Sequence, residues 1–580
     1  MSTPSLWAPY AAAVELVTAE GRTPMSRAEG AWWRSDTALE GGQRYAFSVD
    51  GGDPRPDPRG LALPDGPHGR SAWFDPGGFA WSDEGWKGRE LSGAVLYELH
   101  VGTFTRGGTL DDAVERLPYL AELGIDVIEL LPLAAFPGEH NWGYDGVAPY
   151  SVHEAYGGPA ALQRFVDAAH AHGLAVCLDV VYNHLGPDGN YLGEIGPYFT
   201  DKHATPWGQG LNLDGPDSDE VRRWVLDNVR QWLGDFHVDG LRLDAVHELH
   251  DESALHVLEE MSREVDALAE ATGRSLWLVA ESDRNDPGTV TPRGAGQQGG
   301  GRGVHGQWAD DIHHAFHVAL TGETQGYYAD FATPEALAKV LRTPFFHDGT
   351  YSSFRERRHG RPVDATTVPG WRFVASLQTH DQVGNRALGD RLSGAQLDLD
   401  PGVLACGAAV LLTSPYTPML FMGEEWGART PWQFFTDHID QGIAEATRDG
   451  RRAEFGSHGW DEKDVPDPQD PKTFLRSRLD WSEVDQEPHA RLLGWYRDLI
   501  ALRRSAADLR DPRLDRTEVS WTGRHLQVGR GAHRVLVNLD GEPWRCLADG
   551  DLVLSWQPDV AVRDGHVEVP ARSALVLRAG

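Results

Sequence analysis

Short apolar runs alternate with helical stretches through the middle of the chain, and this rhythm constrains the fold more than any other feature. Eight runs begin at or near Val95, Val127, Ala175, Gly240, Leu276, His305, Phe373 and Pro418. Apolar runs of strand length that alternate with helices indicate a parallel sheet whose strands are buried on both faces. Eight such units over roughly 400 residues predict an α/β protein built on a (β/α)8 TIM barrel with insertions.

The segments on either side of the predicted barrel have a different pattern. Residues 1–88 contain short alternating runs separated by Gly and Pro clusters, which predict an N-terminal β-sandwich. Residues 89–512 form the predicted catalytic barrel, and residues 185–213 form an irregular excursion from it. Residues 513–580 return to short alternating runs and predict a C-terminal all-β sandwich domain.

Four acidic residues, Asp179, Asp244, Glu281 and Asp381, each close one of the apolar runs. The carboxyl ends of the strands of a barrel meet at one mouth, so carboxylates from four strands should converge on one pocket. Acidic residues that only mark the change from strand to loop would explain one such position, but hardly four. We therefore predict an enzyme with an acid/base site.

Charge and composition exclude several classes of partner. The formal net charge of −34 repels phosphate backbones and anionic lipid surfaces, so we expect neither nucleic acid nor a membrane as a partner. A neutral substrate is compatible with this charge. The N-terminus shows no basic region followed by an apolar stretch, and no apolar segment approaches membrane-spanning length, so we expect a cytoplasmic protein.

The stretches around the four acidic residues resemble the four signature regions of the α-amylase family of glycoside hydrolases, in the same order. These stretches are Asp179–His184, Gly240–His247, Val279–Ser282 and Gln378–Asp381. The resemblance implies a retaining mechanism with two carboxyl groups of opposed protonation across the scissile bond. It makes Asp244 the nucleophile and Glu281 the general acid and then base, and it makes Asp381 the group that stabilises the transition state.

The same resemblance implies roles for residues around these three. Arg242 would keep Asp244 ionised through a charge-assisted hydrogen bond, and Asp179 would orient Arg242. His184 and His380 would bind sugar hydroxyls in the cleavage subsite, where Tyr144 would stack on the sugar; a purely structural role is the alternative for each histidine. Asn183 matches a calcium ligand of many α-amylases, but no oxygen-rich cage follows it, so we predict neither a metal nor a cofactor.

Further stretches resemble one branch of this family, the maltooligosyltrehalose trehalohydrolases. They are Phe136–Gly138, Asn141–Val147, Thr205–Gly208, Asn212–Ser218, His380–Arg386, Phe421–Gly427 and Phe434–His438. This resemblance implies hydrolysis of the α-1,4 bond next to the terminal trehalose of maltooligosyl-trehalose, which releases trehalose in trehalose biosynthesis. The expected partners are maltooligosyl-trehalose and α-glucan oligosaccharides, and we expect a monomer or a weak oligomer.

Recognition of a trehalose leaving group must come from loops on the leaving-group side of the site. Many amylases carry Lys at the position of His247, and we infer that His247 lies on that side. Further candidates for substrate contacts are Trp207, Asn212, Glu248, Gln307, Trp308, Asp310, Phe354, Arg355 and, beside Asp381, Asn385. For the leaving-group residues a structural role is an equal alternative.

Two other functions are compatible with parts of this pattern. A glycogen branching enzyme-type α-glucan transferase shares the fold and the chemistry, but the trehalohydrolase-like stretches argue against it. An inactive glucan-binding relative would not need Arg242, Asp244, Glu281 and Asp381 together, and all four are present.

Overall fold

The computed structural model describes residues 3–295, 300–457 and 464–579, and its centre is a closed barrel of parallel strands. The strands follow one another around the barrel in chain order, and the last pairs with the first. They are β8 (Leu96–Leu99), β9 (Val127–Leu130), β10 (Ala175–Val180), β13 (Gly240–Leu243), β14 (Trp277–Ala280), β15 (Gly306–Trp308), β18 (Phe373–Ser376) and β19 (Thr417–Phe421). The predicted (β/α)8 barrel is confirmed.

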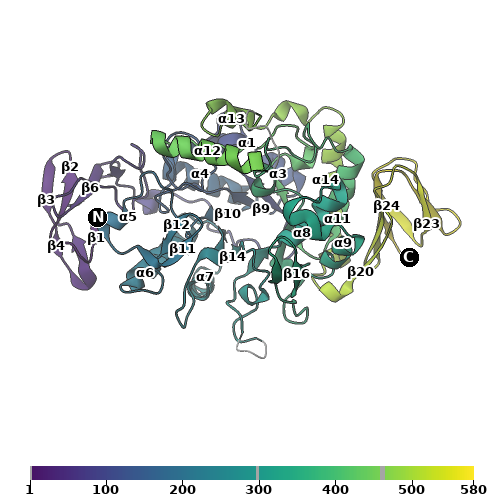
Figure 1. The fold of residues 1–580 in the computed structure, drawn as a ribbon, viewed down its shortest axis with the longest axis horizontal. Helices are drawn as coiled ribbons and strands as arrows, with labels where there is room; N and C mark the ends of the chain where they lie inside the picture. The colour runs from purple at the N-terminus through teal and green to yellow at the C-terminus, as the bar shows by residue number, and fades with distance from the viewer. Residues whose placement is uncertain (1–2, 296–299, 458–463, 580) are drawn as a thin grey trace.

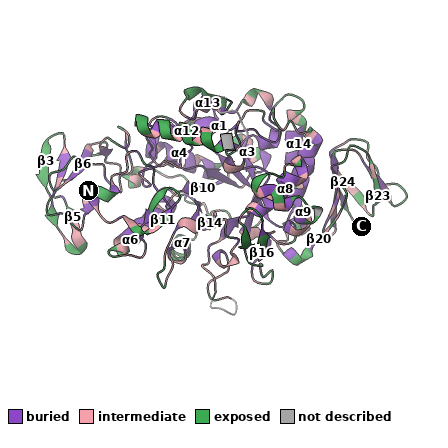
Figure 2. Cartoon of the chain, viewed as in Figure 1, coloured by how far each residue is buried: buried purple, intermediate pink, exposed green. Residues whose placement is uncertain are grey.

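The barrel strands are buried along their whole length, as their nearly continuous apolar sequences predict. Leu178, Leu241 and Leu278 pack in the main core, and the register between β10 and β13 aligns Asp179 with Arg242. In Figure 2 the buried residues fill the barrel and the inner sides of its helices, whereas exposed residues gather on the outer elements.

Helices follow the strands and surround the barrel (Figure 1). The principal ones are α3 (Leu117–Leu123), α4 (Gly158–Ala171), α6 (Ser218–Arg230), α7 (Val257–Thr272), α8 (Asp310–Thr321), α11 (Pro401–Thr413) and α14 (His489–Ser505). Residues 110–123 form two helices, because α2 (Leu110–Val114) ends before α3 begins. Pro118 at the start of α3 lacks an amide proton, which favours a new helix start at this point.

The seventh apolar run also differs from expectation. β18 ends at Ser376, and Asp381 lies in the short helix α10 (His380–Gly384) instead of at the end of the strand. The hydroxyl of Thr379 accepts a hydrogen bond from the backbone N–H of Gln382, so Thr379 is the N-cap that starts the helix. Asp381 is thus carried by a helix that rests on the barrel mouth.

Two β-rich regions lie at opposite ends of the long axis in Figure 1, with the barrel between them. The N-terminal region forms sheets β1-β5-β4 and β3-β2-β6-β7, with strands β1 (Ser5–Trp7), β2 (Val14–Thr18), β3 (Gly21–Pro24), β4 (Ser26–Arg27), β5 (Trp32–Arg34), β6 (Arg44–Val49) and β7 (Ser71–Ala72). The C-terminal region forms sheets β20-β21-β22-β26-β24 and β23-β25, with strands β20 (Thr517–Thr522), β21 (His525–Arg530), β22 (His533–Asn538), β23 (Trp544–Leu547), β24 (Asp551–Ser555), β25 (His566–Val569) and β26 (Ser573–Arg578). The domain boundaries stay predictions.

Smaller elements complete the loops of the barrel. The excursion at 185–213 holds α5 (Leu192–Ile195) and the hairpin of β11 (Phe199–Thr205) and β12 (Gly208–Leu211). A second hairpin, β16 (Thr350–Ser352) with β17 (Arg357–His359), lies between β15 and β18, and α12 (Gln441–Ser457) follows β19. Within the described part of the chain, no helix is long and apolar enough to cross a bilayer.

Candidate active site

Three of the predicted carboxylates come together at the carboxyl end of the barrel. Asp244 directly follows β13 and Glu281 directly follows β14, whereas Asp381 comes from α10. The exposed fraction of the side chain is 10% for Asp244, 18% for Glu281 and 35% for Asp381. The three carboxylates are thus exposed to increasing degrees, and all are reachable from solvent.

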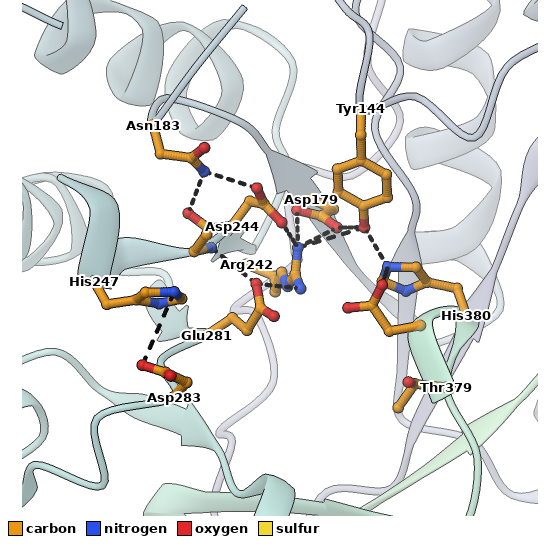
Figure 3. Close-up of polar contacts among 12 residues, drawn as sticks. Tyr144, Asp179, Asn183, Arg242, Asp244, His247, Glu281, Asp283, Thr379 and His380 are labelled. Carbon is orange, nitrogen blue, oxygen red and sulfur yellow. Dashed lines mark hydrogen bonds and ion pairs between the residues drawn. The ribbon is translucent and has the colours of Figure 1, made fainter. Parts of the chain in front are cut away.

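The guanidinium of Arg242 contacts the carboxylates of Asp179, Asp244 and Glu281, and we call these four residues the floor of the site (Figure 3). Nη1 lies 2.7 Å from Asp179 and 2.8 Å from Oδ1 of Asp244, and Nη2 lies 2.8 Å from Oε2 of Glu281. The ring of Trp308 covers the guanidinium carbon at 4.4 Å. Burial opposes the charge of Arg242, but these carboxylates outweigh burial and raise its pKa well above the usual value. One fixed cation thus lies against the carboxylates of both Asp244 and Glu281.

The side chain of Asn183 fixes the other oxygen of Asp244. Its amide nitrogen donates to Oδ2 of Asp244 at 2.7 Å and to the backbone oxygen of Asp244 at 2.9 Å. Its amide oxygen contacts Nδ1 of His184, and Nε2 of His184 lies 3.0 Å from the backbone oxygen of Tyr144. Both ring nitrogens of His184 therefore contact the protein, and its predicted contact with a sugar hydroxyl stays a prediction.

Glu281 is held by one carboxylate oxygen. Its Oε2 accepts a hydrogen bond from the backbone N–H of Ala245 at 2.8 Å and also forms the ion pair with Nη2 of Arg242, and no described residue forms a hydrogen bond to Oε1. Ala245 has a φ of 37°, a left-handed conformation that is costly for a residue with a Cβ. This strained residue directly follows Asp244, and its amide links the positions of Asp244 and Glu281.

Tyr144, His380 and Asp179 form a chain of contacts beside the three carboxylates (Figure 3). The hydroxyl of Tyr144 donates to Asp179 at 2.6 Å and lies 2.7 Å from Nε2 of His380, and the two rings stack at 5.1 Å. Nε2 of His380 is 3.5 Å from Oδ1 of Asp381, to which the amide of Asn385 donates at 3.3 Å. Burial lowers the pKa of His380, but nearby carboxylates outweigh burial and raise it to about 9.

The rim of the site, which includes Trp207, His247, Glu248, Asp283, Phe354 and Arg355, has longer contacts and more exposed side chains than the floor. Nε2 of His247 lies 4.0 Å from both Glu248 and Asp283, and Arg355 lies 3.3 Å from Asp283. Trp207 is 52% exposed and stacks on His184 with ring centres 4.5 Å apart. Phe354 is 56% exposed and meets Tyr327 edge-on.

The sequence reasoning missed Asp283 and Tyr327 at this rim. Asp283 lies two residues after Glu281 and pairs with His247 and Arg355. Its sequence signal was an acidic residue two positions beyond a strand-end carboxylate. Tyr327 precedes the hairpin that carries Phe354 and had no comparable signal, because only the fold brings the two together.

Three predicted substrate-contacting residues are not at the rim. The amide nitrogen of Asn212 donates to the backbone oxygens of Pro197 and Pro216, and its amide oxygen accepts from Gly215, so Asn212 shapes its own loop. Gln307 is fully buried and pairs in register with Ala280 on the helix side of the barrel wall, whereas Trp308 faces the barrel interior, where its ring lies over Arg242. The contacts predicted between these three residues and the substrate stay predictions.

Asp310, at the start of α8, is half-buried close to the catalytic carboxylates. Burial raises its pKa to about 8, and Glu281 and Asp381 add to this effect. Asp310 is therefore largely a neutral acid near pH 7. Among the described residues no group of three or more His, Cys, Asp or Glu side chains is arranged to hold a metal ion.

Comparisons with known proteins agree with this geometry. The family "Alpha amylase, catalytic domain" matches residues 74–203. The chain is 55% identical over 99% of both sequences to a malto-oligosyltrehalose trehalohydrolase of Arthrobacter ramosus. It is 26% identical, over 74% of its length and 61% of the relative's, to a 1,4-alpha-glucan branching enzyme of Corynebacterium jeikeium. A crystal structure of a Salmonella typhimurium protein, named provisionally as an alpha amylase, superposes with a TM-score of 0.90 at 38% identity, covering 100% of this chain and 97% of that one.

Proposed function

The chain belongs to the malto-oligosyltrehalose trehalohydrolase family, and we propose that its site cleaves the α-1,4-glucosidic bond next to the terminal trehalose of maltooligosyl-trehalose. The products are free trehalose and a maltooligosaccharide. It is a glycosidase of the α-amylase family. The observation that carries the proposed mechanism is that one buried guanidinium, that of Arg242, contacts both Asp244 and Glu281 at the barrel mouth.

In the first step Asp244 attacks the anomeric carbon of the glucosyl unit on the non-reducing side of the scissile bond. The bond from that carbon to the leaving oxygen breaks, and Glu281 gives its proton to this oxygen, so that trehalose leaves. Arg242 and Asn183 hold Asp244 in place, so the nucleophile needs little reorganisation. We assign the proton to Oε1 of Glu281, because no described residue forms a hydrogen bond to this atom.

In the second step water cleaves the glycosyl ester on Asp244. Glu281, now ionised, takes a proton from the water, whose oxygen attacks the anomeric carbon. Asp381 stabilises the positive charge that develops on the sugar in both steps. Two inversions at one carbon retain its configuration, which requires the two carboxylates to lie about 5 Å apart. Their shared contact with a single guanidinium supports such a spacing.

Selection of a trehalose leaving group rests on the looser rim. Trp207 and Phe354 offer exposed aromatic faces for sugar rings, and His247, Glu248, Asp310 and Arg355 offer polar groups for hydroxyls. A trehalose unit has two linked anomeric carbons and no reducing end. A maltose unit in its place would leave some of these polar groups unpaired, which lowers its transition-state binding.

The function is tested by incubation with maltotriosyl-trehalose. Trehalose plus maltotriose in equal amounts is the expected result. Longer or branched glucans would support the alternative of a branching-type transferase, and no turnover would support the glucan-binding alternative. Glu281→Gln, which keeps the shape but cannot supply the proton, should abolish turnover while binding persists; retained hydrolysis would remove Glu281 from its role.

The biological setting is part of the proposal. Maltooligosyl-trehalose and α-glucan oligosaccharides are the proposed partners, and trehalose biosynthesis is the proposed context, because the related proteins carry the trehalohydrolase name over nearly the full chain. The cytoplasmic location and the monomeric or weakly oligomeric state also remain predictions from the sequence.

A further inference from the structure

Glu98 contacts His380 in the active site, and the mechanism above gives Glu98 no role. It lies on β8 and is 1% exposed. One carboxylate oxygen lies 2.5 Å from Nδ1 of His380, and the other accepts the backbone N–H of His380 at 3.0 Å. Both carboxylate oxygens of the buried Glu98 thus contact His380, the residue next to Asp381.

The directions of the hydrogen bonds around His380 assign it a positive charge. The hydroxyl of Tyr144 gives its proton to Asp179, so its oxygen accepts from Nε2–H of His380. Nδ1 faces Glu98. A proton between a carboxylate and an imidazole belongs to the imidazole, which is the more basic group. Both ring nitrogens of His380 therefore carry protons, and the imidazolium lies between Glu98 and Asp381.

Other titratable groups also face this imidazolium. Arg242 on β13 lowers the pKa of His380, whereas burial lowers the pKa of His100, which follows β8, to about 3, so His100 is uncharged. Glu129 on β9 lies close enough to interact with His380. Asp179 on β10 reaches His380 through Tyr144. The two direct anionic neighbours of the ring, Glu98 and Asp381, are the groups that outweigh burial and Arg242.

We propose that Glu98 is a positioning residue that keeps His380 charged and aligned with Asp381 and with the sugar in the cleavage subsite. This inference rests on the proposed function. The fixed cation lies 3.5 Å from the carboxylate of Asp381 and offsets its charge. It also presents Nε2–H beside Asp381, where a sugar hydroxyl can share the proton that Tyr144 accepts in the free protein.

The chain offers a matched control on the neighbouring strand. Glu129 pairs in register with Glu98 and is also 1% exposed, but neither of its carboxylate oxygens has a hydrogen-bond partner among the described residues. Burial raises the pKa of Glu129 well above its usual value, so it is a neutral acid. Glu129→Gln replaces one neutral group by another of the same shape, whereas Glu98→Gln removes a charge.

The experiment measures kcat and KM for maltotriosyl-trehalose from about pH 5 to about pH 10 in both variants. For Glu98→Gln we expect kcat to fall about 10- to 100-fold, the loss typical of one hydrogen bond to a charged group, with KM nearly unchanged. A raised pKa means that the cation persists below it and is lost above it. The cation should therefore be lost near pH 9 in the unmodified protein and about 1–3 units lower in Glu98→Gln, so the alkaline limb of the variant should begin at lower pH than that of the unmodified protein.

Glu129→Gln should keep both the rate and the pH profile. An unchanged profile in Glu98→Gln, or an equal loss in Glu129→Gln, would overturn the proposal. A second measurement needs neither turnover nor a folded variant at Glu98. The unmodified protein is labelled at histidine for NMR, and the ring signals of His380 are identified as those that His380→Gln lacks. These signals should show both ring nitrogens protonated up to about pH 9. Titration of those signals near the ordinary value of about 6.5 would refute the role of Glu98. Failure of the unmodified protein to release trehalose would refute the proposed function instead.

Discussion

Arg242, beneath the cleavage point, and Arg355, on the leaving-group rim, each pair with carboxylates, but in opposite surroundings. The Arg242 side chain is 0% exposed and contacts Asp179, Asp244 and Glu281 at 2.7–2.8 Å. The Arg355 side chain is 24% exposed and lies 3.3 Å from Asp283, whose side chain is 45% exposed. Charges in a dry floor hold one geometry, whereas pairs in water are weak and adjustable. The floor thus fixes the chemistry, and the rim is free to select the leaving group.

The largest expected contrast is in turnover. Asp244→Asn keeps the shape of the nucleophile and removes its charge, so kcat should fall by at least about 10⁴-fold, as for other single nucleophile losses. Glu248→Gln, on the rim, should lower kcat/KM by no more than about tenfold, because it removes one partly exposed contact. Initial rates on maltotriosyl-trehalose measure both. Similar losses in the two variants would erase the distinction between floor and rim.

The next contrast is in stability. Arg242→Met leaves Asp179 and Asp244 buried without their cation and should lower the free energy of unfolding by about 3–5 kcal/mol. Arg355→Met should lower it by about 1 kcal/mol or less, because its pair is exposed to solvent. Urea unfolding at neutral pH compares the two. A loss for Arg355→Met as large as that for Arg242→Met would show that the rim is as rigid as the floor.

The smallest effect sharpens the role of the rim in selection. Trp207→Ala removes an exposed ring and should change the free energy of unfolding by about 0.5 kcal/mol at most. It should lower kcat/KM for maltotriosyl-trehalose by about 10- to 100-fold, since stacking of a sugar on the indole is lost. The rate on a plain maltooligosaccharide of equal length should change less. An equal loss on both substrates would assign Trp207 to general glucan binding.

Much of this arrangement could be predicted from the sequence, because parallel strands place their working groups at one mouth. The strand-end positions of Asp244 and Glu281 follow from their apolar runs alone, and Arg242 is two residues before Asp244 on the same face of β13. The exact place of Asp381 could not be predicted this way. Thr379 ends the apolar pattern and caps α10, so the carboxylate sits on a helix.

Other parts of the site depend on contacts between distant segments. Asn212 and Gln307 have residue types suited to sugar binding, but Asn212 bonds to backbone groups of its own loop and Gln307 is buried on the helix side of the barrel wall. Glu98 gave only a weak signal, an acidic residue within an apolar run, and Glu129 gave the same signal without the same contacts. The fold distinguishes the two because α10 lies over one of them.

The most direct test of the central claim is the anomeric configuration of the first product. Proton NMR spectra recorded during the first minutes of hydrolysis of maltotriosyl-trehalose resolve the α and β anomers of the new reducing end. Attack by Asp244 with Glu281 as acid and base predicts trehalose together with α-maltotriose, which then equilibrates slowly with the β anomer. Initial release of β-maltotriose, or maltotriose without trehalose, would contradict the account.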